Sequence, residues 1–71
     1  MAVFLVWTEQ FGEGAELHAI CSTRERARGI LAAKIYVWPD LPNPWHNTEG
    51  DTWGNERDLQ TAWIEEREVL T

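Results

Sequence analysis

Apolar and polar positions at the amino end of the chain predict two strands. Residues 2–7, AVFLVW, form a continuous apolar run rich in β-branched and aromatic side chains, which is typical of a strand buried on both faces. Residues 15–21, AELHAIC, alternate instead, and this period of two places Leu17 and Cys21 on the same, inner face. The intervening segment 8–14 contains two glycines, so we expect it to form a hairpin connection.

A helix is predicted to follow directly. Ser22 with Glu25 three residues later forms a capping box, in which each side chain satisfies a free backbone N–H of the first turn. Apolar residues then recur at spacings of three and four, which gives the helix a stripe that can lie on a sheet: Ala27, Ile30 and Leu31. The helix must end before Pro39. Residues 35–38, IYVW, fit either its last turn or a short extended piece.

The second half of the chain predicts a long loop and one more strand. Residues 39–59 show no periodicity and contain three prolines, two glycines and three asparagines. Irregular connections of this length are uncommon in compact domains and are usually functional or disordered. Apolar content resumes in residues 60–70, QTAWIEEREVL, which we interpret as a last strand with a charged middle.

These elements predict a single α+β domain over residues 1–71, with a three-stranded sheet in ββαβ order covered by one helix. A right-handed crossover brings the last strand to the free edge of the first, parallel to the second, so the first strand is central. One helix leaves a sheet face open. We expect the long loop to cover that face, with Trp45 and Trp53 beside Trp7 and Trp63, or another chain to do so.

Charge is distributed unevenly. The net charge of −6 argues against direct, sequence-independent binding to nucleic acid, which requires clustered cations. Between Ser22 and Ile35, four basic residues against one acidic residue give +3, which leaves −9 for the rest of the chain. A basic helix on an acidic body can steer a charged partner.

The single cysteine, Cys21, excludes a disulfide within the chain and is typical of a reducing cytoplasm. The opening apolar run lacks a basic region before it and is too short for a signal peptide or a membrane span. We therefore expect a cytoplasmic protein without membrane contact.

Catalytic and metal chemistry find little support. On one strand, His18 and Cys21 would face opposite directions, and His46 alone cannot complete a metal site. The carboxylates of residues 65–68 have no spacing that distinguishes an acid from a base. We expect no metal, no cofactor and no enzymatic activity.

The candidate binding residues are Trp45, Trp53 and His46 of the loop with Arg24, Arg26 and Arg28 of the helix. Tryptophan and arginine are enriched at the energetic centres of protein interfaces. The same residues offer an alternative, in which an indole stacks on a base while an arginine meets a phosphate at the amino end of the helix.

The segments VFLV and LHAICSTRERA, separated by a Gly-Glu turn, resemble short uncharacterised bacterial and phage proteins in which a hairpin runs into a serine-capped helix. The resemblance covers residues 2–31 and 62–70, and its motifs are structural. It implies a phage or mobile-element accessory protein.

The sequence therefore favours a non-enzymatic interaction protein, phage-encoded, that inhibits a host defence or regulatory macromolecule and self-associates as a dimer. The alternative is a protein that sequesters a nucleotide-like signal, and a small hydrolase is the third hypothesis.

Overall fold

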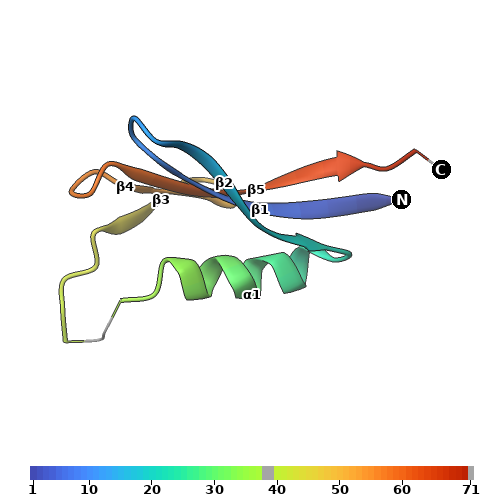
Figure 1. Ribbon diagram of the computed structural model, residues 1–71. Helices are drawn as coiled ribbons and strands as arrows, with labels where there is room; N and C mark the ends of the chain where they lie inside the picture. The colour runs from blue at the N-terminus through green and yellow to red at the C-terminus, as the bar shows by residue number, and fades with distance from the viewer. Residues whose placement is uncertain (38–39, 71) are drawn as a thin grey trace.

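The computed structural model describes residues 1–37 and 40–70 as one sheet with a helix packed against one face (Figure 1). The described residues form five strands and one helix: β1 (Ala2–Gln10), β2 (Gly14–Cys21), α1 (Arg24–Lys34), β3 (Trp45–Glu49), β4 (Thr52–Asn55) and β5 (Gln60–Glu68). The sheet order is β2-β1-β5-β4-β3, and every neighbouring pair is antiparallel. The molecule extends over 45 × 27 × 19 Å.

The predicted three-stranded sheet is wrong, because the segment 39–59 is not one irregular loop. It contains β3 and β4, which pair with each other and extend the sheet beyond β5. The middle strand is consequently β5 rather than β1. The position of β1 between β2 and β5, with β5 parallel to β2, agrees with the sequence-based prediction.

The β3–β4 hairpin forms with few apolar residues because its turn is closed by polar groups. Gly50 adopts φ +53°, a conformation that favours glycine. The Asn47 side-chain Nδ2 donates hydrogen bonds to the carbonyl oxygens of Gly50, at 2.8 Å, and Thr52, at 3.2 Å. Local hydrogen bonding therefore replaces the hydrophobic alternation that usually marks a strand pair.

Helix α1 begins one residue later than the capping box predicts. Its N-cap is Thr23, whose side-chain oxygen accepts a hydrogen bond from the Arg26 N–H at 3.2 Å. Ile35 is the C-cap, and its N–H still donates to the Leu31 carbonyl oxygen at 3.1 Å, whereas residues 36 and 37 are neither helix nor strand. Trp38 and Pro39 lie outside the described residues. Within the described part, no helical segment has the length and apolar character needed to cross a membrane.

The hydrophobic core lies between α1 and one face of the sheet. Val6 and Ala62 from the sheet meet Ala27 and Leu31 from the helix, and all four are buried. Partly buried apolar side chains surround this cluster, among them Phe4, Ile64, Trp45 and Trp53. The core is therefore one-sided, and the face away from α1 has no layer of secondary structure over it in the described residues (Figure 1).

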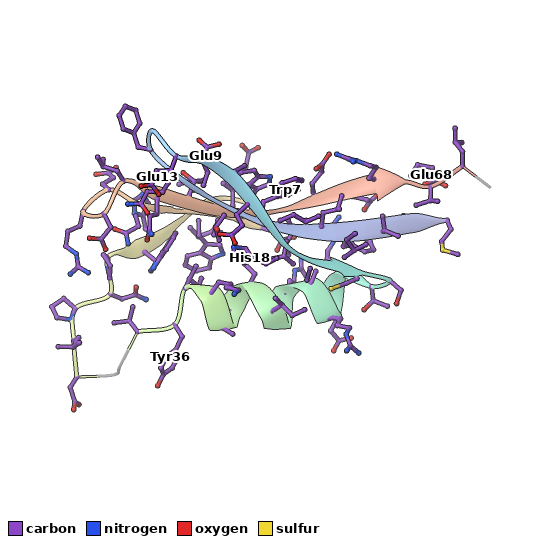
Figure 2. All side chains as sticks on the ribbon, viewed as in Figure 1. Trp7, Glu9, Glu13, His18, Tyr36 and Glu68 are labelled. Carbon is purple, nitrogen blue, oxygen red and sulfur yellow. The ribbon has the colours of Figure 1, made fainter. Side chains whose placement is uncertain are left out.

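A β-bulge in β2 changes which side chains face the core. Val6 pairs with Ala19 whereas Trp7 pairs with Leu17, so His18 is the extra residue. Leu17 consequently lies on the uncovered face, and its prediction as an inner residue is wrong. His18 lies between sheet and helix, with its Nε2 2.6 Å from the Thr8 hydroxyl oxygen (Figure 2). It shares this side with Cys21, contrary to the prediction that the two face opposite ways.

Because the core is one-sided, each buried helix residue has a large effect on stability. We predict that Leu31→Ala lowers the free energy of unfolding by about 2–5 kcal/mol, since it removes apolar contact and leaves a cavity. Leu41→Ala is the matched control, because Leu41 is exposed and its truncation is expected to change stability by less than about 0.5 kcal/mol. Urea unfolding followed by tryptophan fluorescence measures both, and equal midpoints would contradict this core.

Candidate functional site

The face of the sheet away from α1 carries a pair of stacked tryptophans. Trp7 of β1 lies directly opposite Trp63 of β5, and the ring centroids are 6.2 Å apart with an interplanar angle of 13°. The Trp7 Nε1–H donates a hydrogen bond to Glu65 Oε1 at 3.0 Å, which fixes the orientation of the indole. Figure 2 shows Trp7 and Glu9 on this side of the sheet.

Other apolar side chains extend this pair into a strip. Leu5 lies two residues before Trp7 on β1 and is buried. On β2, Leu17 pairs with Trp7 and Ile20 pairs with Leu5, and the Ile20 side chain is 64% exposed. We call Leu5, Trp7, Leu17, Ile20 and Trp63 the tryptophan strip. Leu17 and Ile20 are exposed and the two indoles are partly buried, and apolar side chains left uncovered on a sheet face are typical of interaction sites on small proteins.

A groove adjoins the tryptophan strip at the end of the sheet formed by the β1–β2 and β4–β5 turns. Across the strands, Glu9, Thr61, Gly54 and His46 follow one another as paired neighbours. Gly54 has no side chain, and the sheet surface is hollowed there to a volume of about 320 Å³. We call this hollow the tip groove.

The walls of the tip groove are two exposed apolar residues that a backbone contact brings together. The Phe11 N–H donates a hydrogen bond to the Leu59 carbonyl oxygen at 2.9 Å, which joins the β1–β2 turn to the β4–β5 turn. Phe11 is 79% exposed and Leu59 is 59% exposed. Leu59 also has φ +55°, a left-handed conformation that is unfavourable for a branched side chain.

Asn55 holds the β4–β5 turn in this shape. Its buried side chain donates from Nδ2 to Asp58 Oδ2 at 3.0 Å and accepts at Oδ1 from the Asp58 N–H at 3.0 Å. The hydrogen bond from Asn55, with one from Arg57, lowers the pKa of Asp58 below its usual value. These hydrogen bonds close the turn directly before Leu59.

On the opposite face, two helix arginines bind one carboxylate of the β3–β4 turn. Arg24 Nη1 lies 2.7 Å from Asp51 Oδ2, and Arg28 Nε lies 2.8 Å from Asp51 Oδ1. Arg24 also reaches Glu66 Oε1 at 2.8 Å, and its guanidinium carbon lies 5.0 Å from the centre of the Phe4 ring. We call Arg24, Arg28 and Asp51 the arginine clamp, because it ties α1 to the hairpin.

Asp51 and Glu66 together balance the charges of Arg24 and Arg28. The pKa of Asp51 is lowered, mainly by the hydrogen bond from Arg28; burial opposes this shift, and the hydrogen bond from Arg24 adds to it. The same contact with Asp51 raises the pKa of Arg24. The clamp therefore stabilises the fold, and it leaves little positive charge to attract a phosphate.

The structure divides the six sequence-predicted binding residues between the two faces. Arg28 and Trp53 meet at a cleft of about 230 Å³ between α1 and the β3–β4 turn, and Arg24 joins them through Asp51. Trp45 lies with Lys34 and His18 at a separate hollow of about 170 Å³.

Arg26 and His46 lie apart from these residues. Arg26 is exposed on α1, and its side chain forms no ion pair with any described residue. His46 lines the tip groove on the other face of the sheet, with Nε2 3.9 Å from Glu56 Oε1.

The expectation that Trp45 and Trp53 cover the open face is wrong. Both pack against the core on the helix side of the sheet. The open face carries Trp7 and Trp63, which are partly buried and were expected there, and the exposed Phe11 lies at the tip groove; none of the three was predicted as a binding residue. The alternation of Trp63, Glu65 and Arg67 along β5 was a signal that Trp63 shares a face with charged residues.

Among residues 1–37 and 40–70, no three His, Cys, Asp or Glu side chains are grouped so that they could hold a metal ion. Comparison of the chain with family models, with curated proteins and with solved structures finds no match.

The arginine clamp predicts a pH dependence of stability. The pKa of Asp51 is lowered on folding, so its contribution is present above the pKa of the unfolded chain and is lost as the pH falls through the folded value, below about pH 4. We predict that Asp51→Asn lowers the free energy of unfolding by about 1–2 kcal/mol at pH 7 and has less effect at pH 3. Urea midpoints at the two pH values measure this difference.

Asp40→Asn provides the control for that experiment, because Asp40 is exposed and has no ion pair with a described residue. It should leave both midpoints unchanged. Equal losses for Asp51→Asn at pH 7 and pH 3 would show that the carboxylate charge is not what stabilises the hairpin.

The left-handed backbone at Leu59 predicts a substitution that stabilises the protein, in contrast to Asp51→Asn. Asparagine tolerates this conformation better than leucine, so Leu59→Asn is expected to raise the free energy of unfolding by about 0.5–1 kcal/mol. Thermal unfolding followed by circular dichroism checks it. A lower midpoint for Leu59→Asn would mean that the contacts of the leucine side chain outweigh the backbone strain.

Proposed function

We propose that the protein is a non-enzymatic interaction protein that binds and modulates a protein partner through the tryptophan strip. The observation that carries this proposal is a sheet with a helix on one face and stacked, partly exposed indoles on the other. Aromatic side chains supply much of the binding energy at protein interfaces, because they bury a large area with little loss of side-chain freedom.

A protein partner fits this surface better than a nucleotide. The arginines that would contact a phosphate lie on the opposite face, where Asp51 already binds Arg24 and Arg28. The chain as a whole carries a net charge of −6, which opposes the approach of a polyanion. The apolar side chains of the strip favour a partner that buries apolar area of its own.

The perturbed acid–base groups support a role without catalysis. Shifted pKa values often identify catalytic residues, yet here each lowered carboxyl pKa accompanies a contact that joins parts of the fold. Asp51 binds α1, Asp58 binds Asn55 within a turn, and Glu65 binds Arg67 and the Trp7 indole. Action in a reducing cytoplasm, on a host macromolecule, is the setting that we propose for this binding activity.

Ile20 provides the sharpest test, because it is 64% exposed and belongs to the tryptophan strip. We predict that Ile20→Glu abolishes binding of the partner without unfolding the protein, since a charge would have to be desolvated in the interface. Leu41→Glu is the matched control, because it also adds a charge at an exposed apolar residue, outside the strip.

The measurement is quantitative affinity purification with wild type and the two variants, each first shown by circular dichroism to be folded. A protein retained by wild type and Leu41→Glu but lost with Ile20→Glu is the expected result. Equal retention by all three rules out the strip as the binding surface. Light scattering in parallel identifies the case in which a second copy of the chain occupies the strip, because only Ile20→Glu would then dissociate the dimer.

A further inference from the structure

We propose that the tip groove holds a lysine or arginine side chain of the bound segment, next to an apolar residue that lies on the tryptophan strip. This inference rests on the proposed function and names the chemistry of the partner: a basic, extended peptide segment.

Charge at this end of the sheet favours a cation. Glu9 and Glu56 line the tip groove. Glu9 also borders a second hollow of about 360 Å³ at the β1–β2 turn, to which Glu13 and Glu16 contribute, although Glu16 pairs with Thr8 and so lies toward the helix side of the sheet. Neither hollow is lined by a lysine or arginine in the described part of the chain. Figure 2 shows Glu9 and Glu13 together at this end of the molecule.

Among the described residues, these carboxylates have no lysine or arginine within ion-pair distance, which leaves them available to a cation. The ion pairs formed by the described arginines involve other acidic residues, namely Asp51, Asp58, Glu65 and Glu66. Within the same part of the chain, Glu56 has only His46 at ion-pair distance, 3.9 Å away. A cationic side chain entering the tip groove would therefore meet unneutralised negative charge.

The shape of the tip groove suits a long side chain with a charged end. Phe11 and Leu59 form apolar walls, and the base of the groove is open at Gly54, which has no side chain. The aliphatic stem of lysine or arginine can pack against such walls while its charged group reaches the carboxylates. The Phe11 ring adds the possibility of a cation–π contact. At about 320 Å³ the groove lies at the small end of ligand pockets, which suits one side chain.

Continuity with the tryptophan strip sets the spacing of the bound segment. Glu9 is two residues from Trp7 on β1, and Thr61 is two residues from Trp63 on β5, so both pairs share a face. Two residues of an extended strand span about 7 Å. An extended peptide also advances about 7 Å in two residues. When its basic residue lies in the tip groove, the peptide residue two positions away therefore lies on the tryptophan strip.

The test uses short synthetic peptides and isotope-labelled protein. One peptide contains Arg-Gly-Leu between glycines, a second replaces arginine with uncharged citrulline, and a third replaces leucine with alanine. Two-dimensional NMR follows the backbone amides of Glu9, Gly54 and Glu56 and the indole N–H groups of Trp7 and Trp63. We expect the arginine peptide to change the chemical shifts of both the groove amides and the indole N–H groups. The citrulline peptide should bind roughly tenfold more weakly.

Charge-matched variants separate a local contact from overall attraction. Glu9→Gln with Glu56→Gln should weaken the arginine peptide roughly tenfold. Glu25→Gln with Asp40→Asn removes the same charge outside the groove and should leave affinity within about twofold, since exposed charges at a distance are screened by salt.

Each remaining outcome decides between the proposals. Equal binding of the arginine and citrulline peptides, or no shift at millimolar peptide, overturns the cation site in the tip groove. Indole shifts that depend on leucine but not on arginine also overturn it, while the proposed function of the tryptophan strip stands. Arginine-dependent binding that leaves the Trp7 and Trp63 indole signals unshifted keeps the groove and contradicts the strip.

Discussion

The structure depends on one constraint, which is that a single helix of 11 residues can cover only one face of a five-stranded sheet. Val6, Ala62, Ala27 and Leu31 form the core on that face, and the domain is small enough for this one core to supply most of its stability. The second face must then meet water or a partner. Its stacked indoles and exposed Ile20 are the reason that we propose a partner for this face.

Electrostatics reinforces the difference between the two faces. The basic residues of α1 look like an anion site in the sequence. Asp51 forms ion pairs with two of them, Arg24 and Arg28, and these contacts connect the helix to the β3–β4 hairpin. At the turn end of the sheet the reverse holds, because Glu9 and Glu56 meet no lysine or arginine in the described residues. The acidic end of the open face is therefore where the negative charge of the chain is available to a partner.

The sequence predicted the elements whose apolar pattern is strong, and it failed where structure depends on polar or long-range contacts. The apolar run of β1 predicted its place between β2 and β5, and the helix stripe predicted the packing of Ala27 and Leu31. Strands β3 and β4 were not predicted, because apolar and polar residues do not alternate in WHNTE and TWGN. Gly50-Asp51 is nevertheless a two-residue hairpin signal. The bulge at His18 and the arginine clamp depend on pairing across the sheet, which local pattern does not encode.

The most direct test is the solvent exposure of methyl groups on the two faces of the free protein. A soluble gadolinium chelate relaxes protons in proportion to their accessibility, and Ile20 and Leu17 report on the open face as Val6 and Leu31 report on the core. We expect strong relaxation of the Ile20 and Leu17 methyls and protection of the Val6 and Leu31 methyls in dilute solution. Protection of Ile20 equal to that of Leu31 would show that the second face is covered in the free protein, and would contradict an open sheet face.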